Sequence, residues 1–99
     1  MAELTVISWR DIPAQVTASD GASTARAVLS DRFQKAIDAA AMTAGLIESA
    51  VYLDEWRRDA RPCGDDLDAE VAAEVARIEA VFDRSALVAL ARAGGTLSG

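Results

Sequence analysis

Histidine is absent from this 99-residue sequence. Ser-His-Asp and Cys-His triads, zinc sites that use histidine and histidine general bases are therefore excluded within the chain. Any chemistry would have to come from carboxylates, arginines, Tyr52 or Cys63, and these form no catalytic constellation in the sequence. We therefore expect a protein that is not an enzyme.

Cysteine is nearly absent too, since Cys63 is the only one. It cannot form an internal disulfide, which fits a reducing compartment. No apolar run approaches the ~18 residues of a membrane span, and Glu3 stands where a signal peptide would carry Lys or Arg. We expect a cytoplasmic protein that contacts no membrane.

Basic charge is scarce. The 10 Lys and Arg residues face 16 Asp and Glu residues, for a net charge of -6 and a pI near 4.4. This balance argues against a dedicated nucleic-acid binder, because phosphate contacts need a basic surface that releases counterions. The preference for Arg over Lys, together with abundant Ala, indicates a GC-rich bacterial source.

The chain does carry enough apolar bulk for one small core. We expect a single domain over residues 1–95 and a frayed tail over 96–99. Alanine inflates the hydrophobic fraction of 52%, so the core is expected from the larger apolar residues, namely Leu4, Val6, Ile12, Val16, Leu29, Phe33, Ile37, Leu53, Leu67, Val71, Val75, Ile78, Phe82, Leu87 and Leu90.

The first part of the chain predicts a hairpin. β-rich alternation predicts strands over 3–9 and 14–18. Asp20-Gly21 indicates a two-residue turn with positive φ at both positions. The segment 24–29 then suits a third strand, although its alanines are equally compatible with an early helical turn.

The rest of the chain predicts mainly helices. Apolar residues at helical spacing predict a helix from Ser30-Asp31 to Gly45, a long helix over 66–82 and a short last helix ending at Gly94-Gly95. The segment 50–58 alternates and predicts a strand, although the spacing of its two aromatic residues also suits a helix. The expected class is α+β, a two-layer sandwich with a small, mostly antiparallel sheet of three or four strands, two long helices and a short C-terminal helix.

A Trp-Arg pair recurs at two predicted strand ends, as Trp9-Arg10 and Trp56-Arg57-Arg58. If these strands are neighbours, the indoles and guanidiniums form one docking patch, because Trp and Arg are enriched at interaction hot spots. The alternative is structural, with each Trp closing an edge of the core and each Arg paired with an Asp. Arg57, Arg58 and Arg61 also suit an anionic group.

The turn Cys63-Gly64-Asp65-Asp66 precedes the long helix. Asp65 and Asp66 are typical of a helix N-terminus, as caps and dipole partners. The same position would lower the pKa of the Cys63 thiol and suit a partner-facing or redox-sensing cysteine. No second soft ligand stands beside it, so neither a metal nor a cofactor is expected. The acids Glu70, Glu74 and Glu79 are expected on a solvated helix face.

Four strings resemble one family. They are Trp9-Arg10-Asp11-Ile12-Pro13-Ala14-Gln15-Val16, Arg32-Phe33-Gln34-x-Ala36-Ile37-Asp38-x-Ala40-Ala41-Met42, Tyr52-Leu53-x-Glu55-Trp56-Arg57-Arg58 and Cys63-Gly64-Asp65-Asp66-Leu67. They resemble the small bacterial "virulence factor" family, which also occurs as a domain of conserved virulence factor C proteins, and the resemblance extends from Leu4 to about Phe82. The resemblance implies no catalytic residues and favours an interaction role.

We therefore expect a small non-enzymatic binding or adaptor domain for another protein, with a homodimer left open. Its partner surface is expected at Trp9, Arg10, Trp56, Arg57, Arg58, Arg61, Cys63, Asp65 and Asp66. The alternative that the resemblance offers is an accessory of corrinoid- and folate-dependent methyl transfer, with the arginines on an anionic group and Cys63 as a redox or ligating thiol.

Overall fold

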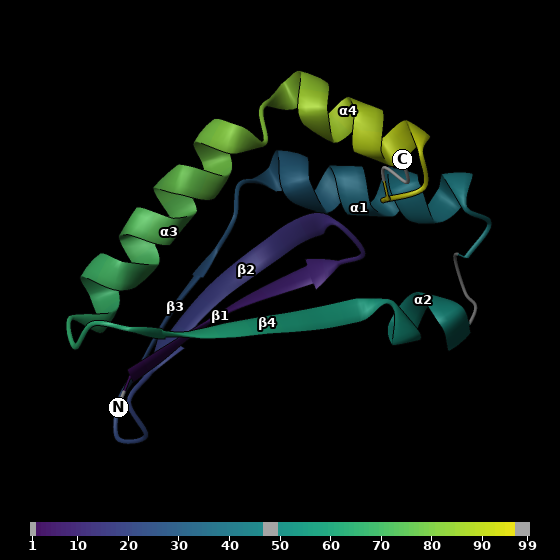
Figure 1. Cartoon of the computed structure of the whole chain (residues 1–99). Helices are drawn as coiled ribbons and strands as arrows, with labels where there is room; N and C mark the ends of the chain where they lie inside the picture. Colours follow the sequence, from purple (N-terminus) through teal and green to yellow (C-terminus); the bar gives the residue numbers. More distant parts are fainter. Residues whose placement is uncertain (1, 47–49, 97–99) are drawn as a thin grey trace.

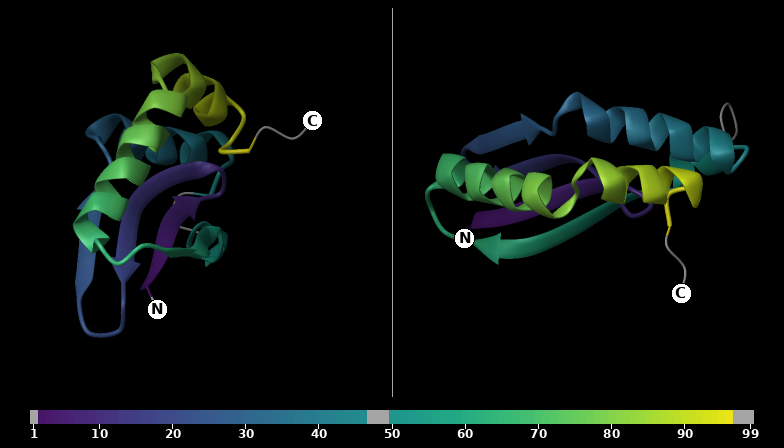
Figure 2. Two further views of the ribbon diagram at one scale, coloured as in Figure 1. Left: turned by 60° about the vertical axis from the view of Figure 1, so that its left-hand side comes forward. Right: turned by 90° about the horizontal axis from the view of Figure 1, so that it is seen from above.

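A computed structural model describes residues 2–46 and 50–96, and these residues form a sheet with a helical layer on one face (Figures 1 and 2). The described strands pair in the order β3-β2-β1-β4, and every pairing is antiparallel. The strands are β1 (Ala2–Trp9), β2 (Ile12–Ser19), β3 (Thr24–Val28) and β4 (Trp56–Cys63).

The helices of the described part are α1 (Asp31–Thr43), α2 (Ala50–Asp54), α3 (Leu67–Val81) and α4 (Arg84–Arg92). α3 lies over β2 and β3, while α1 lies over β2 and packs alongside α4. The short α2 stands at the start of β4, as Figure 1 shows. The predicted α+β class, with helices on one side of an antiparallel sheet, is confirmed.

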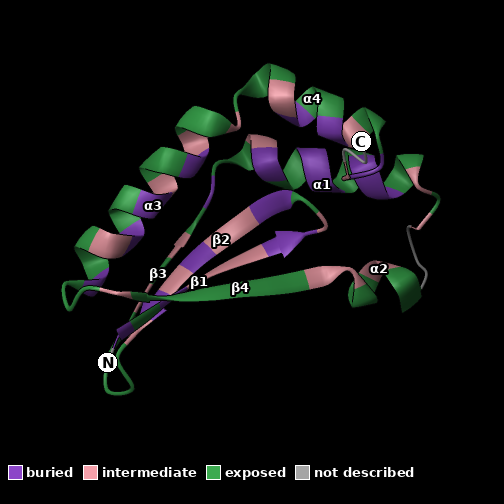
Figure 3. Ribbon diagram, viewed as in Figure 1, coloured by how far each residue is buried: buried purple, intermediate pink, exposed green. Residues whose placement is uncertain are grey.

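The core lies between the two layers and takes most of the residues that the sequence predicts (Figure 3). Leu4, Ile12, Val16 and Ile37 are fully buried. Small side chains let α1 approach the sheet closely, and its Ala40 and Ala41 are likewise fully buried. The buried faces of α1 and α3 therefore pack on the sheet, while α4 packs on α1. This arrangement removes apolar area from water.

The predicted strand over 50–58 is confirmed for residues 56–58, which begin β4, and is wrong for residues 50–54, which form α2. The sequence of this segment fits both the alternation of a strand and the residue spacing of a helix, and tertiary packing determines which of the two forms. The turn of α2 brings the Tyr52 ring to 5.5 Å from the Trp9 ring. Leu53, expected in the core, is instead 69% exposed.

The predicted two-residue hairpin turn is also wrong. Ser19 pairs with Thr24, so the loop holds four residues. The Asp20 carboxylate accepts hydrogen bonds from the N–H groups of Ala22 and Ser23 at 2.9 and 2.7 Å. Gly21 alone in this loop has a positive φ, of 93°. The Asp side chain thus organises a wider loop in place of a tight turn. The predicted frayed tail lies, apart from Thr96, outside the described residues.

Candidate functional site

β4 is an edge strand that presents nearly all of its side chains to solvent. It pairs with β1 on one side, and residues 57–62 are exposed (Figure 3). Five of the residues predicted for the partner surface lie on this strand, namely Trp56, Arg57, Arg58, Arg61 and Cys63. The structure therefore places these five residues on one strand, and the sequence did not predict that this strand forms a sheet edge.

Among the strands that the structure describes, β4 pairs with β1 alone, so its other backbone edge is open. The Arg10 N–H donates to the Glu55 carbonyl at 3.0 Å. Hydrogen-bonded pairs alternate along an antiparallel ladder, so β4 residues of the same parity as Glu55 bond to β1. Trp56, Arg58 and Ala60 therefore direct their N–H groups outward. Pro62 shares this parity and lacks an N–H, as is typical of the open side of an edge strand.

The two Trp-Arg segments do meet, because Trp9 pairs with Trp56 in the β1–β4 register. They do not present two indoles to solvent, however. Trp9 is fully buried and donates its indole N–H to the Tyr52 carbonyl at 2.8 Å. Trp56 is half-buried, with its ring 6.3 Å from the Tyr52 ring in an edge-on arrangement. Trp9 thus closes one end of the core, as the structural alternative expects.

Arg10 and Arg57 hold the same end of the molecule together. Arg10 has φ 52°, donates to the Gly94 carbonyl at 2.8 Å and lies 3.5 Å from the Glu55 carboxylate. Arg57 lies 3.6 Å from Asp11 and 4.0 Å from Glu55. These contacts assign both guanidiniums to structural ion pairs, with Arg57 the more exposed of the two.

Arg58 differs from its neighbours. It lies on the open face of the sheet beside Thr5 and Ile7, and within residues 2–46 and 50–96 it makes no hydrogen bond or ion pair. Of the three arginines predicted for an anionic group, the other two are already paired with carboxylates. Of the three arginines expected to bind an anionic group, only Arg58 is therefore unpaired among the described residues.

Arg61 joins a cluster that sequence analysis missed. Glu74, expected on a solvated face, is 5% exposed, and its carboxylate accepts hydrogen bonds from Arg61 at 3.0 Å and from Arg77. The hydrogen bond from Arg77 is the main cause that lowers the pKa of Glu74, against the opposing effect of burial. A signal was present, since Glu74 lies seven residues after Leu67 and four before Ile78, in the phase of the buried stripe.

A groove of about 280 Å³ runs between β4 and α3 beside this cluster. Leu4 and Val6 of β1 form its apolar floor, Arg61 lies on the β4 side, and Arg77 and Phe82 lie on the α3 side. The groove therefore combines apolar area with charged walls. That is the composition of a protein-contact surface with a polar rim.

Cys63 ends β4 and is half-buried. Desolvation of the thiol and, next, the charge of Glu70 raise its pKa from the ordinary value of 9.0. The lowering of the thiol pKa considered for a partner-facing or redox-sensing Cys63 is therefore opposed by desolvation and by the nearby acids. Asp65 is exposed in the turn. Asp66 caps α3 as predicted, accepting the Ala69 N–H at 3.2 Å.

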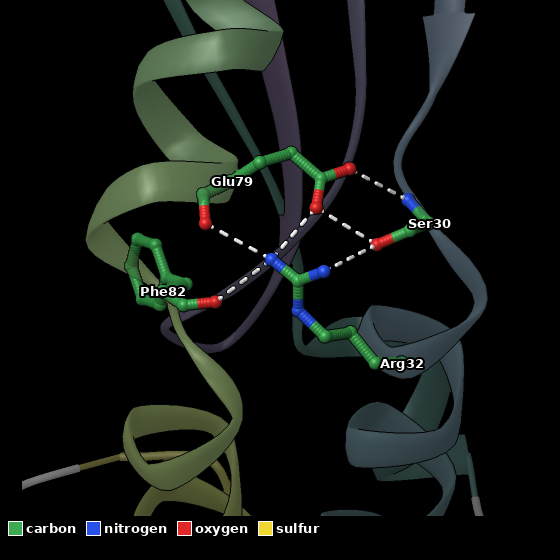
Figure 4. A network of polar contacts seen from close by, with 4 residues as sticks. All are labelled: Ser30, Arg32, Glu79 and Phe82. Carbon is green, nitrogen blue, oxygen red and sulfur yellow. Dashed lines mark hydrogen bonds and ion pairs between the residues drawn. The ribbon is translucent and has the colours of Figure 1, made fainter.

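A second network that sequence analysis missed ties α1 to the end of α3 (Figure 4). Arg32 lies 2.7 Å from the Glu79 carboxylate and donates to the carbonyls of Glu79 and Phe82. The Ser30 hydroxyl donates to Glu79 at 2.8 Å and makes no capping bond to α1. Although desolvation opposes it, the hydrogen bonds from Ser30 and the charge of Arg32 lower the pKa of Glu79. Glu79 is therefore a structural residue, contrary to the expected solvated face.

Among residues 2–46 and 50–96, no group of three or more Cys, Asp or Glu side chains is placed to hold a metal ion. The helices of this same part of the chain are all too short or too polar to cross a membrane.

The fold and this surface define a class of protein, a small α+β two-layer domain with an exposed, arginine-bearing edge strand. The chain belongs to the virulence factor family, whose model matches residues 7–91. The resemblance seen in the sequence is thereby confirmed. Comparisons with curated proteins and with solved structures found no match.

Proposed function

We propose that this family member is a non-enzymatic binding domain, an adaptor that docks another protein along β4. The observation that carries the proposal is the free edge of β4. Its outward N–H groups at Trp56, Arg58 and Ala60 pair well with an extended segment, which would add a strand to the sheet. Main-chain hydrogen bonds supply affinity in this mode, and side-chain contacts supply specificity.

The side chains of β4 set the chemistry of the partner. Arg57, Arg58 and Arg61 outnumber Asp59, and Arg58 has no acidic neighbour bound to it in the described structure. Charges and proline on an edge strand also deter pairing between identical chains. The same charges favour a partner strand with acidic residues, because like charges directly opposite are destabilising and opposite charges are stabilising.

The proposal is tested with a proline at one outward position. Ala60→Pro removes an N–H that an added strand needs, while the ladder between β4 and β1 keeps its hydrogen bonds. Val28→Pro is the matched control. The Leu29 N–H donates to the Ala14 carbonyl at 3.0 Å, so by the same alternation Val28 directs its N–H outward from β3, the other edge.

A protein recovered from the native host by the parent chain is identified, purified and titrated against each variant. We expect Ala60→Pro to weaken binding at least about tenfold, or ~1.4 kcal/mol, and Val28→Pro to leave it unchanged. Recovery of only a second copy of the chain would contradict the proposal, because the charges and the proline of β4 deter pairing between identical chains. Equal binding by the parent and Ala60→Pro, with both folded, would rule out docking at the β4 edge.

A further inference from the structure

α1 and α4 leave a second groove, on the helical layer and away from β4. It has a volume of about 230 Å³. Ala39 of α1 and Leu87, Val88 and Ala91 of α4 line it with apolar surface. The two helices run side by side in the same direction (Figures 1 and 2). The groove therefore lies between two helices that run in parallel.

Its charged lining is entirely basic. Arg32, Lys35 and Arg84 line the groove and no carboxylate does, in a chain of net charge -6. Arg32 is neutralised by Glu79 at 2.7 Å. Lys35 and Arg84 are exposed, and neither makes a hydrogen bond or ion pair within the part of the chain that the structure describes. The available charge of the groove is therefore positive.

The basic character continues along α4. Arg84, Val88 and Arg92 recur at intervals of four residues and line an adjoining hollow. Val88 is 42% exposed. Apolar side chains flanked by cations on one helical face are complementary to a helix with an apolar stripe flanked by acids.

The size of the groove selects its occupant. Pockets that enclose small ligands usually measure ~300–1,000 Å³, and this groove is smaller and open. It has room for a few side chains, as when the ridge of one helix packs into the groove between others. Helix-in-groove recognition uses apolar anchors at i, i+3 or i+4, and i+7.

We propose that the α1–α4 groove is a second docking site, which binds an amphipathic helix of a partner protein whose apolar stripe is flanked by Asp and Glu. The apolar anchors lie on Ala39, Val88 and Ala91, and the acids face Lys35 and Arg84. The site is independent of the β4 edge. A domain with both sites joins two partners, one as a strand and one as a helix.

The experiment uses a synthetic amphipathic peptide of about five helical turns, with a Leu stripe flanked by Glu, and a matched peptide with Gln in place of Glu. Amide chemical shifts of the full chain report where each peptide binds. Lys35 is the only lysine of the chain, so its acylation rate, read by peptide mapping, reports its protection directly. We expect the Glu peptide to shift α1 and α4 amides and to slow acylation of Lys35.

Charge reversal supplies the matched variants. Lys35→Glu with Arg84→Glu should weaken binding of the Glu peptide at least about tenfold, whereas Arg58→Glu on β4 should leave it unchanged. Equal affinity for the Gln peptide, shifts confined to β4, or no binding at ~1 mM peptide would overturn the proposal. Protection of Lys35 by phosphatidylglycerol vesicles but not by the peptide would overturn it too, in favour of a membrane surface.

Discussion

Glu74 determines how one part of the stability depends on pH. Its pKa in the folded chain is lowered from the ordinary value of 4.5. The unfolded chain therefore takes up the proton first as the pH falls, and the stabilisation by ionised Glu74 is complete above about pH 4.5 and is lost through the folded pKa. We expect the difference in unfolding free energy between the parent and Glu74→Gln to be constant from neutral pH down to about pH 4.5 and to shrink at lower pH. Urea denaturation at a series of pH values measures this, and a difference that stays constant down to pH 3 would contradict it.

Gly95 is required by both its backbone and its neighbour. Its φ is 97°, and a Cβ at this position would lie 2.8 Å from the Trp9 ring. Gly21 has φ 93° with open space around it, so it serves as the control. We expect Gly21→Ala to lower the unfolding free energy by ~1–2 kcal/mol, the cost of the left-handed conformation, and Gly95→Ala to lower it by clearly more. Thermal denaturation measures both changes. Similar losses of unfolding free energy in the two variants would mean that the Trp9 ring can move aside for the added methyl group at little cost.

The roles of individual residues were predictable where they depend on nearby residues in the sequence. They were not predictable where contacts with distant residues determine the position of the side chain. Asp66 caps α3 as its position indicates. Glu74 and Glu79 look like solvent-facing acids when charge alone is considered, yet Arg61 and Arg32 come from other elements to pair with them. Ion pairs between residues that are far apart in sequence leave no local pattern. The position of Glu74 on the buried face of α3, in helical register with Leu67 and Ile78, was the one feature that could have indicated its burial.

α3 is the element on which the fold depends most clearly. Val75, expected within its stripe, is half-buried, while Ile78 is 1% exposed and makes the sharper test. Ile78→Asp places an unpaired charge in the core and should abolish cooperative folding. Val81→Asp, at a site that is 58% exposed in the same helix, should change the melting temperature little. A cooperative melt of Ile78→Asp near that of the parent would contradict the packing of α3.

At the level of elements, long periodic segments were predictable and short ambiguous ones were not. α1 and α3 carry several turns of apolar spacing, which specify a helix without further context. The segment 50–58 is too short for its residue pattern to distinguish a strand from a helix. The contact between Tyr52 and Trp9 favours the helical turn. The edge position of β4 depends on strand order, which alternation does not encode.

At the scale of the whole molecule, the buried apolar residues of the described ranges form one core cluster, to which β1, β2 and the three longer helices all contribute. We therefore expect a single cooperative transition. In a Trp56→Phe variant, Trp9 is the only indole and reports the end of the sheet, while far-UV circular dichroism reports the helices. The two midpoints in urea should coincide. Separate midpoints would show that the Trp9 end unfolds independently of the helical layer.

The cover over Trp9 comes from the far end of the sequence. Gly95 lies against the indole ring, and the Gly94 carbonyl binds Arg10 across 84 positions of the chain. A ribosome releases the β1–β2 hairpin long before it releases this cover, and contacts of such long range form late. Throughout that interval the nascent chain carries a bare indole at the tip of its first hairpin. The indole is covered only after Gly94 and Gly95 have left the ribosome and packed against this end of the hairpin.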